Sequence, residues 1–329
     1  MRSGFQNGLN KALSGSVRRV IGCLMSLILS VLTASLLLSQ VGCKPGSGND
    51  PTPPESDPFG TAEDASREAD PQTAYDGENL TVSFLNAGKA DVIVIRHGEH
   101  VIMIDAGLAD EAQVMTGFLA DQGILTIDRL FLTHFDRDHI GGVPELLDHV
   151  KIGEVYVPWF EPKSTDEISD CKAALAKAGI TPEKVRGVKE ILTEDHLLFQ
   201  IDAPQKSSYL RDSSNNSSLV IRLSYAEHSF LFCADAEEER IEELLGRPGM
   251  KAEVIKMPHH GGYEKNLGDL LDEVKPRIAV VTCSDQERES KKTEELLSDR
   301  GIKTFLTRKG TVTITVEEDR MKDTQKSSK

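Results

Sequence analysis

Residues 133–142 have the sequence THFDRDHIGG, and this stretch decides how the rest of the chain is interpreted. Four side chains that can bind a metal ion fall within six residues, namely His134, Asp136, Asp138 and His139. They lie at and just after the end of the predicted strand 128–134, and a loop at the end of a strand can turn several side chains toward one point. Imidazole and carboxylate suit Zn or Mn, while Gly141 and Gly142 let the backbone turn tightly. The stretch predicts a metal site rather than a charged surface turn.

Short apolar segments alternate with helical ones on both sides of this loop. The pattern predicts strands at 80–85, 91–98, 100–107, 128–134, 217–225, 228–235, 252–257, 277–283, 303–307 and 311–316. It predicts helices at 109–119, 142–150, 236–245, 267–274 and 291–298. Two mixed halves, each made of a sheet with covering helices, predict a layered α/β sandwich.

The composition is that of a soluble globular protein. The chain has 329 residues, of which 39% are hydrophobic and 28% charged, so wholesale disorder and a multi-span membrane protein are both excluded. The net charge of -15 has the wrong sign for a protein whose whole surface attracts phosphate backbones. Any contact with nucleic acid therefore needs a local basic patch.

The first 43 residues have the features of an export signal. They contain Arg2, Lys11, Arg18 and Arg19 but no acidic residue, and residues 20–38 are uncharged. A run of this length fits a long signal-peptide core and also the thickness of a bilayer. Gln40-Val41-Gly42-Cys43 resembles the lipobox of bacterial lipoproteins, although Gln40 stands where Leu is usual. A lipoprotein leader and an uncleaved membrane anchor both place the rest of the chain outside the cytoplasm, tethered to the cell membrane.

Three further segments follow the leader. Residues 44–78 are rich in Pro, Gly, Ser and acidic residues, which predicts a flexible acidic linker. Residues 79–320 form the predicted folded domain, and the polar residues 321–329 a disordered tail. The cysteines of the folded part have no CxxC spacing, so we expect buried free thiols at Cys171, Cys233 and Cys283.

The HxDxDHxGG pattern of residues 134–142 resembles the metal-binding motif of the metallo-β-lactamase-fold hydrolases. Its Asp-for-His form is typical of the domain attached to ComEC-type competence DNA-uptake channels. Five more segments resemble that group in the same order, namely 84–91, 104–107, 215–220, 232–236 and 256–262. Asn86 and Ala90 depart from the usual Asp and Gly of the first of them. The resemblance implies a four-layer αββα sandwich, the metallo-β-lactamase fold.

The resemblance also implies a ligand set for two divalent metal ions, Zn or Mn. His134 and Asp136 hold one ion, Asp138 and His139 hold the other, and Asp235 bridges them. Either histidine of the His259-His260 pair fits the remaining ligand position. We assign His259 to the metal and take Asp138 and His260 as the catalytic residues. Two bridged cations lower the pKa of a shared water, so hydroxide is the expected nucleophile.

Two features depart from the group's pattern. A further histidine is common between the first motif and the bridging Asp, but the interval contains only His149, His196 and His228, none of them at a convincing position. Asn216 or Ser218 is therefore expected to approach the site. A Gly-His-Pro segment is also usual after the penultimate strand, and residues 284–292 here have the sequence SDQERESKK instead. Substrate or metal contacts made by that histidine are lost.

Three functions fit these observations. The first is a membrane-tethered extracytoplasmic phosphodiesterase, with DNA among its candidate substrates. The second keeps the fold and the metals but acts on an ester, thioester or lactone, and the acidic surface favours it mildly. The third is a non-catalytic lipoprotein that binds DNA or a partner with a decayed site. The expected binding partners are an anionic small molecule or nucleic acid and the membrane, with no protein partner. Lys251, Lys256 and Lys265 are lysines that attract such an anion in this interpretation.

Overall fold

The computed structural model describes residues 76–193 and 195–326. The predicted leader and nearly all of the predicted linker therefore lie outside the described residues. Within the described ranges, no helix has the length and hydropathy needed to cross a membrane.

The first sheet has eight strands in the order β15-β14-β1-β2-β3-β4-β5-β6. Its strands are β1 (Leu80–Phe84), β2 (Ile93–His97), β3 (His100–Ile104), β4 (Thr126–Phe131), β5 (Lys151–Pro158), β6 (Glu183–Val185), β14 (Val312–Glu317) and β15 (Arg320–Gln325). β1 pairs antiparallel with both β2 and β14, whereas β3 through β6 run parallel to one another. The C-terminal hairpin thus completes a sheet that the N-terminal half begins.

The second sheet has seven strands in the order β13-β12-β11-β10-β9-β8-β7. They are β7 (Val188–Leu192), β8 (Leu198–Asp202), β9 (Val220–Tyr225), β10 (His228–Phe232), β11 (Val254–Lys256), β12 (Ile278–Val281) and β13 (Lys303–Leu306). β10 through β13 are parallel, and β7 through β10 are antiparallel.

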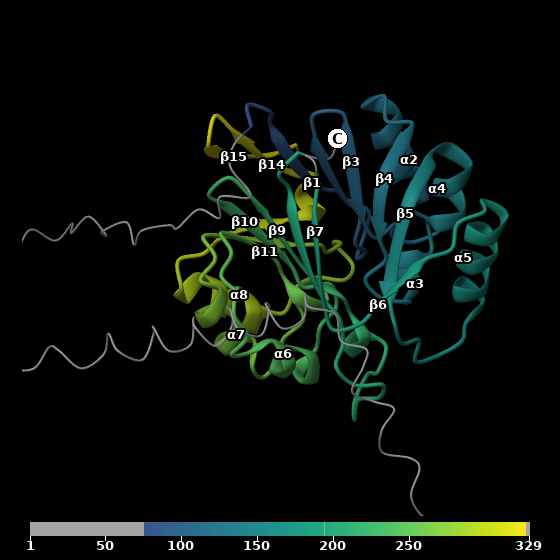
Figure 1. Cartoon of the computed structure of the whole chain (residues 1–329). Coiled ribbons are helices and arrows are strands. Elements are labelled where there is room, and N and C mark those ends of the chain that lie inside the picture. Colours follow the sequence, from purple (N-terminus) through teal and green to yellow (C-terminus); the bar gives the residue numbers. More distant parts are fainter. Residues whose placement is uncertain (1–75, 194, 327–329) are drawn as a thin grey trace, which may run out of the picture. The chain divides into compact units, whose positions relative to one another are not determined.

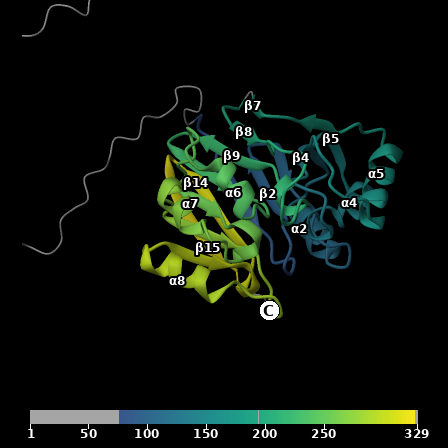
Figure 2. The ribbon, with the colours of Figure 1, turned by 90° about the horizontal axis from the view of Figure 1, so that it is seen from below.

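Helices cover the outer face of each sheet (Figures 1 and 2). α2 (Ala112–Asp121), α3 (Arg137–Ile140), α4 (Val143–His149) and α5 (Asp166–Lys177) lie on the side of the first sheet. α6 (Glu238–Leu244), α7 (Leu267–Val274) and α8 (Lys291–Asp299) lie on the side of the second. Three short 3₁₀ turns, η2 (Asn215–Ser217), η3 (Pro258–Gly261) and η4 (Thr307–Lys309), complete the described elements.

Three apolar clusters hold these layers together. The cluster between the sheets takes alternate residues of each strand, such as Leu80, Val82 and Phe84 of β1, because successive side chains of a strand point to opposite faces. A second cluster joins the other face of the first sheet to its helices, for example Met103 to Met115. A third does the same for the second sheet. The four-layer αββα sandwich predicted from the sequence is confirmed.

Parts of the fold differ from the sequence prediction. The prediction omits β5 through β8 and α5, because residues 151–202 have weak hydrophobic periodicity. The predicted disordered tail at 321–329 is wrong as far as Gln325, since those residues form most of β15 and pair with β14. The end of the predicted linker is also ordered, because Asp76 accepts a hydrogen bond from the Tyr225 hydroxyl at 2.7 Å.

Candidate metal centre

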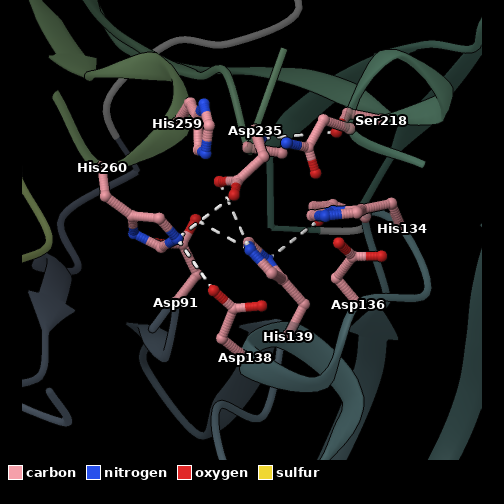
Figure 3. A network of polar contacts seen from close by, with 12 residues as sticks. Asp91, His134, Asp136, Asp138, His139, Ser218, Asp235, His259 and His260 are labelled. Carbon is pink, nitrogen blue, oxygen red and sulfur yellow. Dashed lines mark hydrogen bonds and ion pairs between the residues drawn. The ribbon is translucent and has the colours of Figure 1, made fainter. Parts of the chain in front are cut away.

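The candidate ligands follow the carboxyl ends of three strands that belong to the two sheets. His134 through His139 come after β4 and run into α3, Asp235 comes after β10, and His260 lies in η3 after β11. Ligand sites in sheets of parallel strands gather at this end of the strands. Two distant parts of the chain thus meet at one place (Figure 3).

The paired glycines after the first motif allow a close approach of two backbone segments. Gly142 donates its N–H to the Gly107 carbonyl at 2.9 Å, and Gly107 forms a parallel bridge with Ile140. A Cβ on Gly142 would lie 2.1 Å from the Ala106 carbonyl oxygen. Gly141 and Gly142 have negative φ angles, -59° and -80°, so the site needs their lack of a side chain rather than an unusual backbone conformation.

Four side chains form the centre of the site, and we call them the inner group. One ligand atom from each lies within 4.8 Å of the others, and the four residues are Asp138, His139, Asp235 and His260. Asp235 lies between the two imidazoles: its Oδ1 is 3.3 Å from His139 Nε2, and its Oδ2 is 3.2 Å from His260 Nε2. His260 Nε2 is also 3.4 Å from Asp138 Oδ2. This central position fits the predicted bridging role of Asp235.

Several buried polar atoms of the site have no hydrogen bond among the described residues. They are Nε2 of His134, His139 and His260, together with Oδ1 of Asp235. Buried polar atoms almost always have a partner, because leaving one without a partner costs about 1–3 kcal/mol. Imidazole Nε2 and carboxylate oxygen are common donors to Zn and Mn. The residues present therefore fit a bound cation.

Further hydrogen bonds orient the two imidazoles of the inner group. His139 Nδ1 lies 2.7 Å from Asp105 Oδ2, and Asp105 in turn accepts from the Thr133 hydroxyl at 2.6 Å. His260 Nδ1 lies 2.9 Å from the Thr282 carbonyl. Each Nδ1 therefore serves as the donor, which directs the lone pair of Nε2 into the site. The sequence prediction does not include Asp105 or Thr282, although Asp105 lies in one of the quoted motifs directly after a buried strand.

The charges of the inner group stabilise one another. Burial raises the pKa of Asp235, but the imidazoles of His260 and His139 lower it well below its ordinary value. Burial lowers the pKa of His139, yet Asp235 and Asp105 raise it well above the ordinary value. A cation that binds these nitrogens must displace their protons, so metal affinity falls at low pH.

A buried ion pair supports the inner group from one side. Lys256 is fully buried, and its Nζ lies 2.5 Å from Asp91 Oδ2 and 3.6 Å from Asp235 Oδ1. Asp91 Oδ1 also accepts from the Thr282 hydroxyl at 2.6 Å. The sequence interpretation of Lys256 as a lysine that attracts substrate is wrong, because no solvent reaches it. Lys256 instead supplies a fixed positive charge beside the bridging carboxylate.

His134 and Asp136 lie next to the inner group, and we call them the outer pair. The ring centroids of His134 and His139 are 4.0 Å apart. Burial and the charge of His139 lower the pKa of His134, so its imidazole is neutral and able to act as a ligand. The Asp136 carboxylate contacts Lys163 Nζ at 2.6 Å and accepts a hydrogen bond from Ser214. The outer pair therefore offers fewer ligand atoms than the inner group, and its carboxylate already has two other partners.

The structure exchanges the predicted positions of the two adjacent histidines. His260 belongs to the inner group, whereas His259 Nδ1 lies 3.3 Å from Glu237 Oε1, in a separate group with Glu264. Both histidines have positive φ angles, 44° and 53°, so the backbone turns sharply there. The two ring centroids are 6.3 Å apart, but the rings meet different carboxylates, Glu237 for His259 and Asp235 for His260. The sequence favoured His259 as the ligand and His260 as the catalytic histidine, but the structure places His260, not His259, in the inner group.

The remaining candidates are resolved by their hydrogen bonds. Ser218 approaches the site, because its hydroxyl accepts from the Asp235 backbone N–H at 3.3 Å. Asn216 instead accepts from the backbone of Arg240 in α6. His149 and His228 contact Glu145 and Glu253 and do not join the inner group. The prediction of free, buried thiols is confirmed for all three cysteines of the folded part.

Comparison with known proteins gives one family and several relatives. The model of the metallo-beta-lactamase superfamily matches residues 85–284. ComE operon protein 3 of Bacillus subtilis is 31% identical over 181 residues, which are 54% of this chain and 22% of that protein. Competence protein ComA of Neisseria gonorrhoeae is 24% identical over 208 residues, which are 61% of this chain and 26% of that protein. The matched part thus spans about a quarter of each relative.

Among solved structures, the metallo-beta-lactamase fold protein YhfI from Bacillus subtilis aligns with 74% of this chain and 100% of its own. The TM-score is 0.48 and the sequence identity 8%.

Proposed function

Because the chain belongs to the metallo-beta-lactamase superfamily, we propose that it is a metal-dependent hydrolase whose substrate is a phosphodiester. The observation that carries this proposal is the convergence of the inner group, in which imidazoles and carboxylates from both halves of the chain enclose one small space. A non-catalytic protein with a decayed site is the weaker explanation, because the site keeps buried imidazole and carboxylate atoms that face one another and form no hydrogen bond among the described residues.

The inner group would hold one divalent cation, and the outer pair together with Asp235 would hold a second. Such a pair lowers the pKa of bound water toward neutrality and stabilises negative charge on a substrate oxygen. The protein's own contribution is to fix the ligands. Asp105 and Thr282 set the direction of the imidazoles, and the Lys256 ammonium balances part of the negative charge.

Asp138 connects the cluster to solvent. Its side chain is 22% exposed, while those of His139, Asp235 and His260 are almost completely buried. We therefore keep Asp138 as the residue closest to the reacting group. His259, with a side chain that is 28% exposed, takes over the role first given to His260: it contacts the substrate or donates a proton to the leaving group.

The choice of a phosphodiester rests on the relatives. One relative has the name of a competence protein, which makes DNA a candidate substrate. An ester, thioester or lactone is the alternative. Hydrolysis of bis-p-nitrophenyl phosphate and of p-nitrophenyl acyl esters by the Mn- and Zn-loaded chain separates the two, because a phosphodiesterase favours the former strongly. Faster turnover of the acyl esters would reject the phosphodiester proposal.

Two variants test the role of the site itself. Asp138→Ala should remove most of the activity, and it should lower the amount of metal that remains bound after dialysis. Asp148→Ala is the matched control, because this exposed carboxylate lies at the far end of α4. Unchanged turnover in Asp138→Ala, or a purified protein that binds no transition metal, would exclude a metallohydrolase with this site.

We further propose that the chain acts outside the cytoplasm on a membrane tether. The support is the sequence of residues 1–43, with a basic start, an uncharged run and Cys43 at its end. Metabolic labelling with palmitate should mark the wild-type chain and not the Cys43→Ser variant. If both chains remain in the membrane without label, the leader is an anchor instead. If both are found in the cytosol, the location is wrong.

A further inference from the structure

A cavity of about 330 Å³ adjoins the proposed metal site. Asp136 and Asp138 form part of its wall, and the other lining residues are Phe135, Arg137, Lys163, Thr165 and Glu167. The volume is at the lower end of the range for small-molecule pockets. Because two of the candidate metal ligands line it, a group bound in this cavity is a direct neighbour of the reacting group.

Two cations face this cavity from different elements. Arg137 lies in the first turn of α3, and no hydrogen bond or ion pair engages its guanidinium within the ranges that the structure describes. Lys163 precedes α5, and its Nζ contacts Asp136 Oδ1 at 2.6 Å. Glu167 lines the same cavity. Hydrogen bonds from its own backbone and from Thr165 lower the pKa of Glu167, and the charges of Arg137 and Lys163 lower it further.

The charge of the whole chain makes this pair of cations significant. A net charge of -15 repels an anionic substrate, so a local positive patch is needed to hold one. Guanidinium binds phosphate with two parallel hydrogen bonds, and ammonium binds it as a point charge. When Asp136 and Asp138 bind metal, Glu167 is the one remaining carboxylate among the residues that line the cavity, against the two cations Arg137 and Lys163. Neither Lys251 nor Lys265, which the sequence suggested for this role, lines it.

We propose that Arg137 and Lys163 bind a second phosphate of the substrate, next to the phosphodiester that is hydrolysed. This inference rests on the proposed function and narrows its substrate class. The enzyme then selects a diester flanked by another phosphate, as in a nucleotide chain or a 5′-phosphorylated dinucleotide, over an isolated diester.

The test uses the full chain and two readouts. Calorimetry with inorganic phosphate measures the subsite without turnover, in the presence and absence of Mn²⁺. Kinetics with a thymidine dinucleotide, with and without a 5′-phosphate, measures selectivity as the ratio of the two kcat/KM values. The variants are Arg137→Ala and Lys163→Ala. The control is Lys177→Ala, because this lysine lies at the other end of α5 and is 81% exposed.

Each of the two variants should weaken phosphate binding and lower the selectivity ratio by about tenfold, the size expected when a charged hydrogen bond is lost. Lys177→Ala should match the wild type. Phosphate affinity and selectivity that remain unchanged in both variants would overturn the subsite. A change in Mn²⁺ affinity alone in Lys163→Ala would also overturn it, because Lys163 then acts only on Asp136. The two proposals can also fail separately. If the wild type cleaves neither dinucleotide, but the two variants bind phosphate more weakly than the wild type, the subsite stands and the phosphodiesterase function fails.

Discussion

The inner group and the outer pair are neighbours, but they differ in the number of ligand atoms that they offer a metal and in how firmly the fold holds those atoms in place. The inner group has four ligand atoms within 4.8 Å of one another and an imidazole orientation fixed by Asp105 and Thr282. The outer pair has two ligands, and the carboxylate of Asp136 already contacts Lys163 and Ser214. Affinity depends on the number of ligands and on their preorganisation. The two cations should therefore bind with unequal strength, the inner one first.

The bridging carboxylate should have the largest effect, because both positions depend on it. Asp235→Asn removes a charge that lies between two imidazoles and beside Lys256. Activity should fall by more than about 100-fold, which exceeds the loss typical of a residue that only hydrogen-bonds a metal ligand. Both metal equivalents should be lost from the dialysed protein. Metal content by mass spectrometry and turnover of bis-p-nitrophenyl phosphate check this, with the exposed Asp121→Asn as control. Retention of both equivalents would show that Asp235 is not shared.

The adjacent histidines provide a matched pair of variants. His260→Ala removes an inner ligand, so the tight metal equivalent should be lost and activity should fall by at least about 100-fold. His259→Ala should keep that equivalent, because its imidazole contacts Glu237 instead. Equal loss of tight metal in both variants would mean that the two rings do not have separate roles.

Removal of the outer carboxylate should have a smaller effect. Asp136→Asn should weaken only the second, looser metal equivalent, with a loss of affinity of about 10- to 100-fold. Calorimetric titration of the metal-free protein with Mn²⁺ resolves the two steps. A variant that loses the first step and keeps the second would reverse the proposed order of affinity.

The smallest effect on the metal sites is expected for the Lys256-Asp91 pair, which acts on stability. Breaking a buried ion pair leaves one charge without a partner, so Lys256→Met should lower the free energy of unfolding by about 3–5 kcal/mol. The double variant with Asp91→Asn should recover part of this loss, because neither charge remains alone. Denaturant unfolding of the metal-free chains measures both. The pairing would be contradicted if the double variant lost more free energy of unfolding than the two single variants lose together.

The sequence predicted the layers, and it predicted that the side chains of the first motif lie near Asp235, for a physical reason. Alternating apolar residues define strands, and the ligands of residues 134–139 are so close in sequence that any folded loop brings them together. The resemblance placed Asp235 at the end of a strand in the second half, and the structure has it there, beside His139 and His260.

Other parts could not be derived from the sequence. The choice between His259 and His260 depends on the left-handed backbone between them, and two identical residue types carry no signal for it. Lys256 has the residue type of a surface position, and its contacts with Asp91, Asp235 and the Ala234 carbonyl explain its burial. The cavity with Arg137 and Lys163 needs α5, which the weak periodicity of its segment hid.

The proposed function depends on a cation bound between the two halves of the fold. Anomalous diffraction from crystals of the full chain grown with Mn²⁺ tests this most directly. The strongest peak should lie among Asp138, His139, Asp235 and His260, with a weaker one beside His134 and Asp136. A map with its strongest peak at His259, Glu237 and Glu264, or with none between the strand ends of the two sheets, would contradict the account.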